Sequence, residues 1–179
     1  MCGIFGYLGH QQALPILVEG LRRLEYRGYD SIGVAVDDGE TIQTHKTVGK
    51  VSDLKSILPA SIDGTLGIAH TRWATHGGVT QANAHPHASE NGTVHLVHNG
   101  IIENFQQLRK SLSKRGVECK SETDSEVLAH MMALELEKGA EPLDAVLSTL
   151  RRLRGTWGLC IMFKELDMLV CARNGSPLI

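Results

Sequence analysis

The chain begins Met1-Cys2-Gly3-Ile4-Phe5-Gly6, which places a thiol directly behind the initiator methionine. Cysteine is small enough for that methionine to be excised, which would leave a thiol and a free α-amino group on one residue. An α-amino group has a reference pKa of about 7.7 to 8.0, so near neutral pH it can accept the thiol's proton directly or through a water. Cys2 is therefore a candidate nucleophile with its own base, although a cysteine at the second position is by itself more often a small residue without function.

The apolar pattern that runs outward from this stretch predicts strands, then helices, then strands again. The predicted strands span residues 3–8, 31–36, 41–47, 65–70, 93–98, 156–163 and 167–171. The predicted helices span residues 14–24, 104–115, 124–137 and 142–153. Residues 71–92 are rich in His, Gly, Asn and Thr without a clear period, so we expect a long ordered loop there.

Length and composition indicate one globular domain and argue against several classes of partner. The chain has 179 residues, of which 42% are hydrophobic and 21% are charged, and its formal net charge is -2. That charge provides no basic field for nucleic acid or an anionic membrane surface. No apolar run is long enough to cross a bilayer and the start lacks the pattern of a signal peptide, so we expect a cytoplasmic protein with reduced cysteines.

Five further blocks accompany the opening stretch and carry a family resemblance. They are Leu24-Glu25-Tyr26-Arg27-Gly28-Tyr29-Asp30-Ser31, Ala69-His70-Thr71-Arg72-Trp73-Ala74-Thr75-His76-Gly77, Asn83-Ala84-His85-Pro86-His87, Val97-His98-Asn99-Gly100-Ile101-Ile102-Glu103-Asn104 and Ser121-Glu122-Thr123-Asp124. In this order they resemble the class II glutamine amidotransferases, which are N-terminal nucleophile hydrolases. The residues in these blocks are most similar to those of the members that aminate fructose 6-phosphate, and the resemblance covers residues 1–179.

This resemblance implies a fold and a domain organisation that periodicity alone does not give. The fold class is α+β, the four-layer α-β-β-α sandwich of the N-terminal nucleophile hydrolases, and residues 1–179 form one glutamine amidotransferase type 2 domain. The family's domain continues past Ser176-Pro177-Leu178, so we expect this domain to be incomplete at its C-terminus. In the full-length chain the resemblance implies a sugar-phosphate isomerase domain, absent here, and a homo-oligomer.

The reaction expected of Cys2 requires a group that stabilises an oxyanion. A thiolate that attacks a carboxamide forms a tetrahedral oxyanion, and one preorganised donor is typically worth about 3 kcal/mol of barrier. The Asn99 side-chain amide and the Gly100 backbone N–H can converge on one oxygen, and the missing Cβ of Gly100 lets the substrate come close. Without the family, Asn-Gly is more often a hairpin turn. The resemblance implies the oxyanion role and places Arg27 near the nucleophile.

Glutamine also presents an α-carboxylate and an α-ammonium, and Arg72 and Asp124 offer one opposite charge to each. Arginine binds a carboxylate through two parallel hydrogen bonds. The resemblance implies the same two assignments, with Trp73, Thr75 and His76 completing the pocket wall. The alternatives are a solvated loop cation for Arg72 and a helix cap for Asp124.

Local sequence also predicts how the helix after Asp124 begins. Residues 123–126 fit a capping box, in which Thr123 accepts a hydrogen bond from the first free amides and Glu126 reaches back. Asp124 could then cap the helix and bind substrate at once.

We predict neither a metal nor an organic cofactor. Six histidines lie between His70 and His98, but they include no HExxH motif, no cysteine lies at zinc-finger spacing, and no carboxylate set accompanies them. The expected reaction is hydrolysis of L-glutamine to L-glutamate and ammonia through a thioester on Cys2. Two alternatives stay open, namely the glutaminase of another class II enzyme, such as amidophosphoribosyltransferase or asparagine synthetase, and a truncated module that only binds glutamine.

Overall fold

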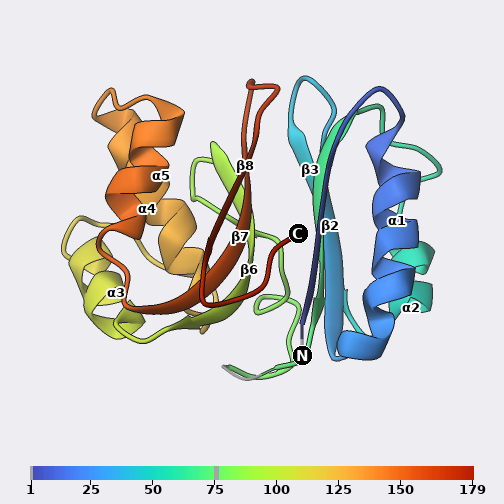
Figure 1. Ribbon diagram of the computed structural model, residues 1–179, viewed down its shortest axis with the longest axis horizontal. Helices are drawn as coiled ribbons and strands as arrows, with labels where there is room; N and C mark the ends of the chain where they lie inside the picture. Colours follow the sequence, from blue (N-terminus) through green and yellow to red (C-terminus); the bar gives the residue numbers. More distant parts are fainter. Residues whose placement is uncertain (1, 75–76) are drawn as a thin grey trace.

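The computed structural model describes residues 2–74 and 77–179 and has four layers (Figure 1). Two antiparallel sheets of four strands face each other, and helices cover the outer face of each sheet. The α-β-β-α sandwich that the family resemblance implies is therefore confirmed.

The first sheet has the strand order β1-β4-β2-β3, and the second has the order β5-β6-β7-β8. The strands of the first sheet are β1 Gly3–Leu8, β2 Ser31–Asp37, β3 Ile42–Val48 and β4 Leu66–Arg72. The strands of the second sheet are β5 His87–Ala88, β6 Val94–Ile102, β7 Gly155–Phe163 and β8 Leu169–Asn174. The outer helices are α1 Ala13–Leu24 and α2 Val51–Ile57 on one side, and α3 Phe105–Ser113, α4 Ser125–Glu137 and α5 Pro142–Leu150 on the other.

Three apolar layers hold the four structural layers together. One lies between the first sheet and α1 and α2, and another lies between the second sheet and α3, α4 and α5. The third lies between the sheets, where Ile68 of β4 meets Val97 of β6 and Met162 of β7. Because both faces of each sheet are covered, strands such as β2 and β7 are apolar along their length instead of alternating with polar residues.

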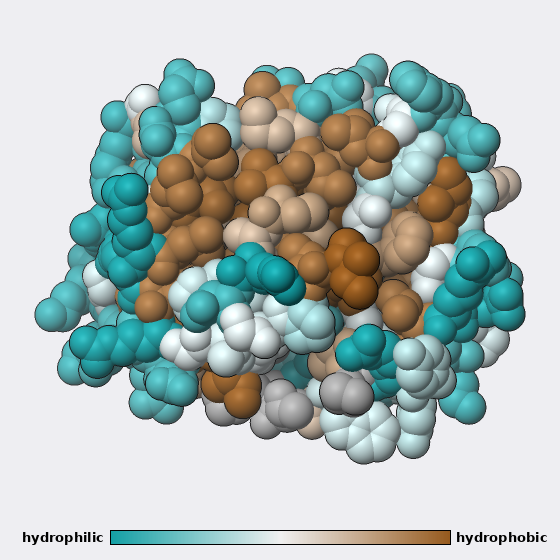
Figure 2. Space-filling model, in the orientation of Figure 1, coloured by the Kyte–Doolittle hydropathy of each residue, from teal (hydrophilic) through white to brown (hydrophobic). Residues whose placement is uncertain are grey.

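The face around β8 is the part of the sandwich that helices cover least (Figure 1). β8 is an edge strand, and its residues Leu169 and Val170 are only half-buried. Apolar side chains gather on this face (Figure 2). Among the residues that the structure describes, none forms a helix with the length and apolarity needed to span a membrane.

The sequence placed nearly every long element correctly and missed three short ones, of which the first is the 3-10 helix η1 Glu25–Arg27. α2 is only seven residues long, too short to show a helical period, and the two-residue β5 lies inside the region expected to be a loop. That region also begins later than expected, because Thr71 and Arg72 belong to β4.

The predicted capping box of α4 is only half right. Thr123 Oγ1 accepts a hydrogen bond from the Glu126 N–H at 3.4 Å, as expected. The Glu126 carboxylate instead accepts from the backbone N–H groups of Lys120 at 2.8 Å and Ser121 at 2.6 Å. The carboxylate therefore reaches past Thr123 and closes the preceding turn.

Candidate active site

The first sheet holds Cys2 at its edge, just ahead of β1. β1 pairs with β4, and the Gly3 N–H donates to Thr71 Oγ1 at 3.1 Å. This pairing brings the Cys2 Sγ to the end of β4, where the Sγ accepts from the Trp73 N–H at 3.2 Å. Gly3 fits here because an added Cβ would lie 2.8 Å from the Cβ of Leu24. The nucleophile candidate is thus held by backbone pairing.

Burial raises the pKa of the Cys2 thiol, although the Trp73 N–H and the charge of Arg72 act in the opposite direction. A thiol with a raised pKa is protonated near neutral pH, so it needs a base before it can attack. This need fits the prediction that the α-amino group of Cys2 acts as that base.

Asn99 and Gly100 lie inside strand β6, so the alternative of a hairpin turn is wrong. The Asn99 Nδ2 donates to the Cys2 backbone carbonyl at 3.2 Å, across a sequence separation of 97 residues. Gly100 has a φ of 138°, and an added Cβ would collide with the backbone carbonyl oxygen of Thr156 on β7. Only glycine fits this position, for both reasons.

Arg72 at the end of β4 and Asp124 just before α4 are both buried, with exposed fractions of 4% and 6%. The Arg72 Nη1 donates to the Gly78 carbonyl at 3.1 Å. Burial lowers the pKa of Arg72, and the negative charge of Asp124 is among the influences that raise it. Arg72 is therefore a partly desolvated cation rather than the solvated loop cation of the alternative interpretation.

Asp124 does not cap α4 with its side chain, which corrects the expectation of a double role. Its Oδ2 accepts from the Ile102 N–H of β6 at 2.8 Å, and its Oδ1 accepts from the Ser125 hydroxyl at 3.2 Å. These contacts tie the start of α4 to the strand that carries Asn99. The carboxylate is thereby fixed beside the oxyanion candidates.

Six of the predicted site residues line one small cavity of about 40 Å³. The lining comprises Cys2, Arg72, Trp73, His85, His98, Asn99, Gly100, Thr123, Asp124 and Ser125. Four of these residues, Cys2, Trp73, Asn99 and Gly100, also line a larger, neighbouring cavity of about 660 Å³, which Arg27 borders too. Thr75 and His76 lie outside the described residues.

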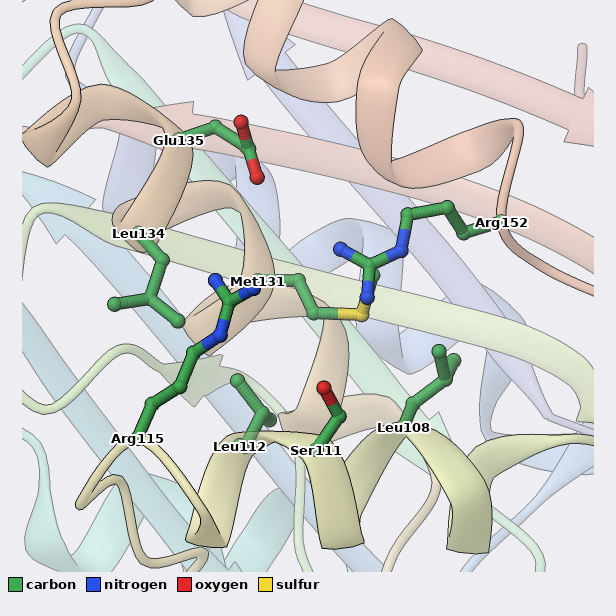
Figure 3. Close-up of a pocket in the computed structure, with 8 residues that line it drawn as sticks. All are labelled: Leu108, Ser111, Leu112, Arg115, Met131, Leu134, Glu135 and Arg152. Atoms are coloured by element: carbon green, nitrogen blue, oxygen red, sulfur yellow. The ribbon is translucent and has the colours of Figure 1, made fainter.

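A depression on the helical side contrasts with this site (Figure 3). Arg115 and Arg152 point toward each other above Met131, between α3 and α4. Its volume of about 10 Å³ is close to the space that a single water occupies. It is thus smaller than both cavities that Cys2 lines.

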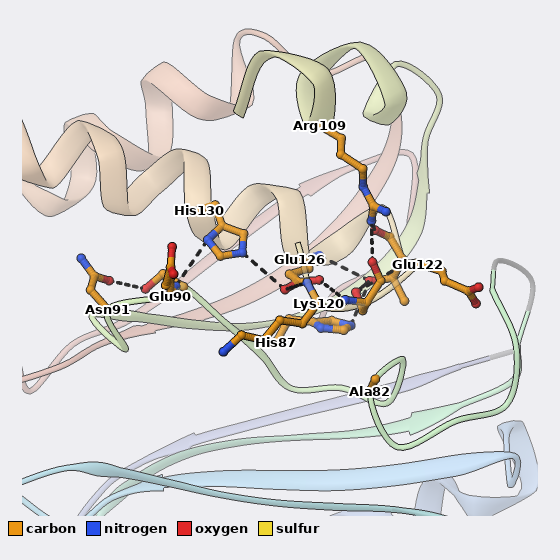
Figure 4. A network of polar contacts seen from close by, with 12 residues as sticks. Ala82, His87, Glu90, Asn91, Arg109, Lys120, Glu122, Glu126 and His130 are labelled. Atoms are coloured by element: carbon orange, nitrogen blue, oxygen red, sulfur yellow. Dashed lines mark hydrogen bonds and ion pairs between the residues drawn. The ribbon is translucent and has the colours of Figure 1, made fainter. Parts of the chain in front are cut away.

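A polar network fixes the segment that precedes α4 (Figure 4). Arg109 donates to the carbonyls of Ser121 and Thr123, each at 2.8 Å. Burial of Glu126 opposes its charge, but hydrogen bonds from His130 and from the Lys120–Ser121 backbone hold its pKa at about 2. A buried carboxylate that stays charged therefore anchors the turn that presents Asp124.

Sequence reasoning assigned no role to the histidines that surround the cavity. His85 and His98 line it, and His70 packs behind Asn99 with its Nε2 at 2.9 Å from the Asn99 Oδ1. Burial lowers the pKa of all three. The only feature of the sequence that could have indicated a role for these histidines is their position inside the family blocks. Within the described residues, no group of three or more His, Cys, Asp or Glu side chains is placed to hold a metal ion.

A comparison with known protein families identifies the family in which this arrangement of residues occurs. Residues 70–178, which include the ends of β4 and β6 and the start of α4, match the family model described as a glutamine amidotransferase domain. The chain belongs to the glutamine amidotransferase family. The matched range covers Arg72, Asn99, Gly100 and Asp124, so the amidotransferase match and the cavity share these four residues.

Relatives of the amidotransferase domain share about half of its residues. It is 51% identical to glutamine--fructose-6-phosphate aminotransferase [isomerizing] of Mesorhizobium japonicum, over 99% of this chain and 29% of that protein. It is 46% identical to the enzyme of the same name from Thermus thermophilus, over 100% of this chain and 30% of that protein. The chain thus spans about 30% of the length of these relatives.

Two solved structures share the fold. Glutamine phosphoribosylpyrophosphate amidotransferase of Bacillus subtilis superposes with a TM-score of 0.82 at 28% identity, over 97% of this chain and 37% of that one. A second structure, described as the allosteric regulatory enzyme of purine biosynthesis, gives a TM-score of 0.78 at 31% identity, over 90% of this chain and 35% of that one. The amidotransferase domain therefore has the N-terminal nucleophile hydrolase fold.

Proposed function

We propose that residues 1–179 form one glutamine amidotransferase type 2 domain, which hydrolyses L-glutamine to L-glutamate and ammonia with Cys2 as nucleophile. The observation that carries this proposal is the single cavity in which a thiol, an amide donor, a buried cation and a buried carboxylate meet. Those four groups are what a carboxamide substrate with an α-carboxylate and an α-ammonium requires.

Each residue of the cavity has a separate role in binding glutamine or in the reaction. Arg72 binds the α-carboxylate of glutamine through a charge-assisted pair, and Asp124 binds the α-ammonium. The thiol proton of Cys2 passes to its own α-amino group, and the Sγ attacks the side-chain carbonyl carbon. Asn99 Nδ2 and the Gly100 N–H stabilise the resulting oxyanion.

The proton then returns to the leaving nitrogen, the C–N bond breaks, and ammonia departs from a thioester on Cys2. A water activated by the same amine hydrolyses the thioester and releases glutamate. Trp73 lines the same cavity, and Arg27 borders the larger cavity that Cys2 also lines. The family resemblance adds Thr75 and His76 to the substrate-binding residues.

For the longer protein we propose that this ammonia is used in the synthesis of glucosamine 6-phosphate from fructose 6-phosphate by a sugar-phosphate isomerase domain. The chain is 46% to 51% identical to glutamine--fructose-6-phosphate aminotransferases but only 28% identical to glutamine phosphoribosylpyrophosphate amidotransferase. These identities support a sugar phosphate over a phosphoribosyl compound as the acceptor of the ammonia. The apolar surface in Figure 2 suits contact with another domain or subunit, in line with a homo-oligomer. Four free cysteines fit a reducing, cytoplasmic location.

Covalent labelling tests the nucleophile. The glutamine analogue diazo-oxo-norleucine should inactivate the protein and label Cys2 in a peptide map, with no adduct on Cys119, Cys160 or Cys171. Burial raises the pKa of the Cys119 thiol to about 11, which leaves it unreactive and makes it a natural internal control. An adduct on another cysteine, or normal ammonia release by a Cys2→Ala variant, would remove Cys2 from the mechanism.

A second experiment tests the base. A preparation that retains Met1 should release no ammonia from glutamine, because acylation of the Cys2 nitrogen turns a basic amine into an amide. A preparation treated with methionine aminopeptidase should be active, and intact mass verifies each state. Equal activity of the two forms would exclude the terminal amine as the base. Inactivity of both, in a protein of natural length, would favour a module that binds glutamine without turning it over.

A further inference from the structure

We infer that His70 is a positioning residue, which fixes the side-chain amide of Asn99 so that its N–H group, and not its carbonyl oxygen, faces the reacting carboxamide. The inference rests on the proposed function and adds to it a residue that is not among those lining the cavity. It starts from one short contact, the 2.9 Å separation between His70 Nε2 and Asn99 Oδ1.

A neighbouring backbone carbonyl fixes the position of the ring proton. His70 Nε2 also lies 3.2 Å from the carbonyl oxygen of His98, which can only accept a hydrogen bond. The Nε2 must therefore carry a hydrogen and act as the donor. The Nδ1 of His70 has no hydrogen-bond partner among the described residues, so no contact calls for a proton there.

The ring proton in turn fixes the amide of Asn99. Facing an N–H donor, Asn99 must present its Oδ1 to His70, because an Nδ2 group there would set donor against donor. The Nδ2 then points to the other side, where it donates to the Cys2 carbonyl at 3.2 Å. The amide nitrogen thus lies beside the nucleophile before substrate arrives.

A flipped amide would have the same shape and the opposite effect. It would aim a carbonyl oxygen at the developing oxyanion, which replaces a stabilising donor with a repelling dipole. Loss of one such donor typically lowers kcat by about 10²- to 10³-fold. The selection of one amide orientation is consequently a requirement of the reaction.

Stacked rings hold His70 in place from behind. Its ring stacks on His85 with centroids 4.2 Å apart, and His85 meets His87 edge-on at 4.5 Å. The His87 Nε2 lies 3.0 Å from Thr123 Oγ1, in the segment that presents Asp124. Burial lowers the pKa of His70 to about 3, so the ring is neutral and carries a single ring proton at physiological pH.

Paired substitutions at His70 separate positioning from packing. His70→Phe keeps a ring that can stack on His85 but removes the donor, whereas His70→Gln restores an N–H donor on a flexible chain. In the protein at its natural length, His70→Phe should lower kcat for glutamine hydrolysis by about 10²- to 10³-fold with little change in KM. His70→Gln should recover a substantial part of that loss.

His95 provides the matched control. It is a buried histidine on β6 that pairs with Met162 in the same layer between the sheets, and it does not line the cavity. His95→Phe should leave kcat unchanged. Each variant is also combined with Asn99→Ala. If His70 acts through Asn99, then His70→Phe adds little to the kcat loss of Asn99→Ala, since the two share one interaction.

The outcomes distinguish the inference from the function on which it rests. Absence of ammonia release by the wild-type protein would overturn both. A wild-type protein that is active, with Asn99→Ala impaired and His70→Phe fully active, would overturn the role of His70 alone. Multiplicative effects of His70→Phe and Asn99→Ala, or equal losses in His70→Phe and His95→Phe, would show a packing role and overturn it as well.

Discussion

The space between the two sheets has an apolar end and a polar end, and the same strands build both. On β4, Leu66 and Ile68 face the opposite sheet and join its apolar layer. Two and four residues further along the same face, His70 and Arg72 are equally buried but polar. The apolar end holds the sheets together, and the polar end uses the geometry that this packing fixes.

Among the described residues, buried ring nitrogens without a hydrogen-bond partner are more numerous at the polar end, although the Nδ1 of His95 at the apolar end is one as well. At the polar end, both ring nitrogens of His85 and the Nδ1 of His70 are buried without a hydrogen-bond partner among the described residues. Such groups cost folding free energy, and native proteins retain them mainly where function needs them. The comparison indicates that the apolar end stabilises the fold, whereas the polar end lowers that stability in exchange for the groups of the candidate active site. The following variants test this difference.

The largest effect is expected from the charged pair. In a Cys2→Ala background, which prevents turnover, Arg72→Ala or Asp124→Asn should weaken glutamine binding by roughly 10²- to 10³-fold, because each leaves a buried ligand charge unpaired. Asn keeps an oxygen that can accept from the Ile102 N–H, so the fold is spared. Calorimetry measures the affinity, with the exposed Arg151→Ala as control. Normal affinity in both variants would place the head group elsewhere.

Asn99→Ala should act on turnover more than on binding. Because the oxyanion exists only during reaction, kcat should fall by about 10²-fold or more while KM stays near that of the wild type. Steady-state ammonia release provides both constants, and Gln43→Ala on β3 is an amide control far from the cavity in the fold. A rise in KM at constant kcat would instead assign Asn99 to substrate binding.

Acid should weaken the fold through the buried histidines. Burial lowers the pKa of His95 to about 4, below its unfolded value of about 6.5, so the unfolded chain binds more protons. Its stabilising contribution is complete above pH 6.5 and is lost as the pH falls toward 4, which amounts to about 2 kcal/mol between pH 7 and pH 5. Urea unfolding at both pH values measures this loss, and His95→Gln should reduce it by that amount. An unchanged pH dependence would contradict the neutral, buried ring.

The smallest effect is expected at the apolar end. Ile68→Val removes one buried methylene, which should lower the free energy of unfolding by about 1 kcal/mol and leave kcat and KM unchanged. Urea unfolding and ammonia release measure the two quantities on the same samples, with the exposed Val48→Ala as a control. A substantial loss of kcat in Ile68→Val would show that the two ends are coupled.

Local sequence was sufficient for the elements whose pattern is long. The predicted strands around Val34 and Ile161 and the helices that become α1, α4 and α5 are all present, because burial imposes a regular apolar period on long segments. α2 and β5 escaped prediction because seven and two residues show no period. The four-layer arrangement came from family resemblance, since periodicity does not reveal which faces two sheets present to each other.

By itself the sequence determined the reacting groups, namely a second-position thiol, an Asn-Gly pair, an arginine and an aspartate in recognisable blocks. Only the tertiary structure decided how they act together. Asn99 meets Cys2 across 97 residues, and Asp124 supports the Ile102 N–H instead of capping α4. Likewise, the ring proton of His70 follows from a carbonyl on another strand. These contacts depend on the register and packing of distant strands, which local propensities do not encode.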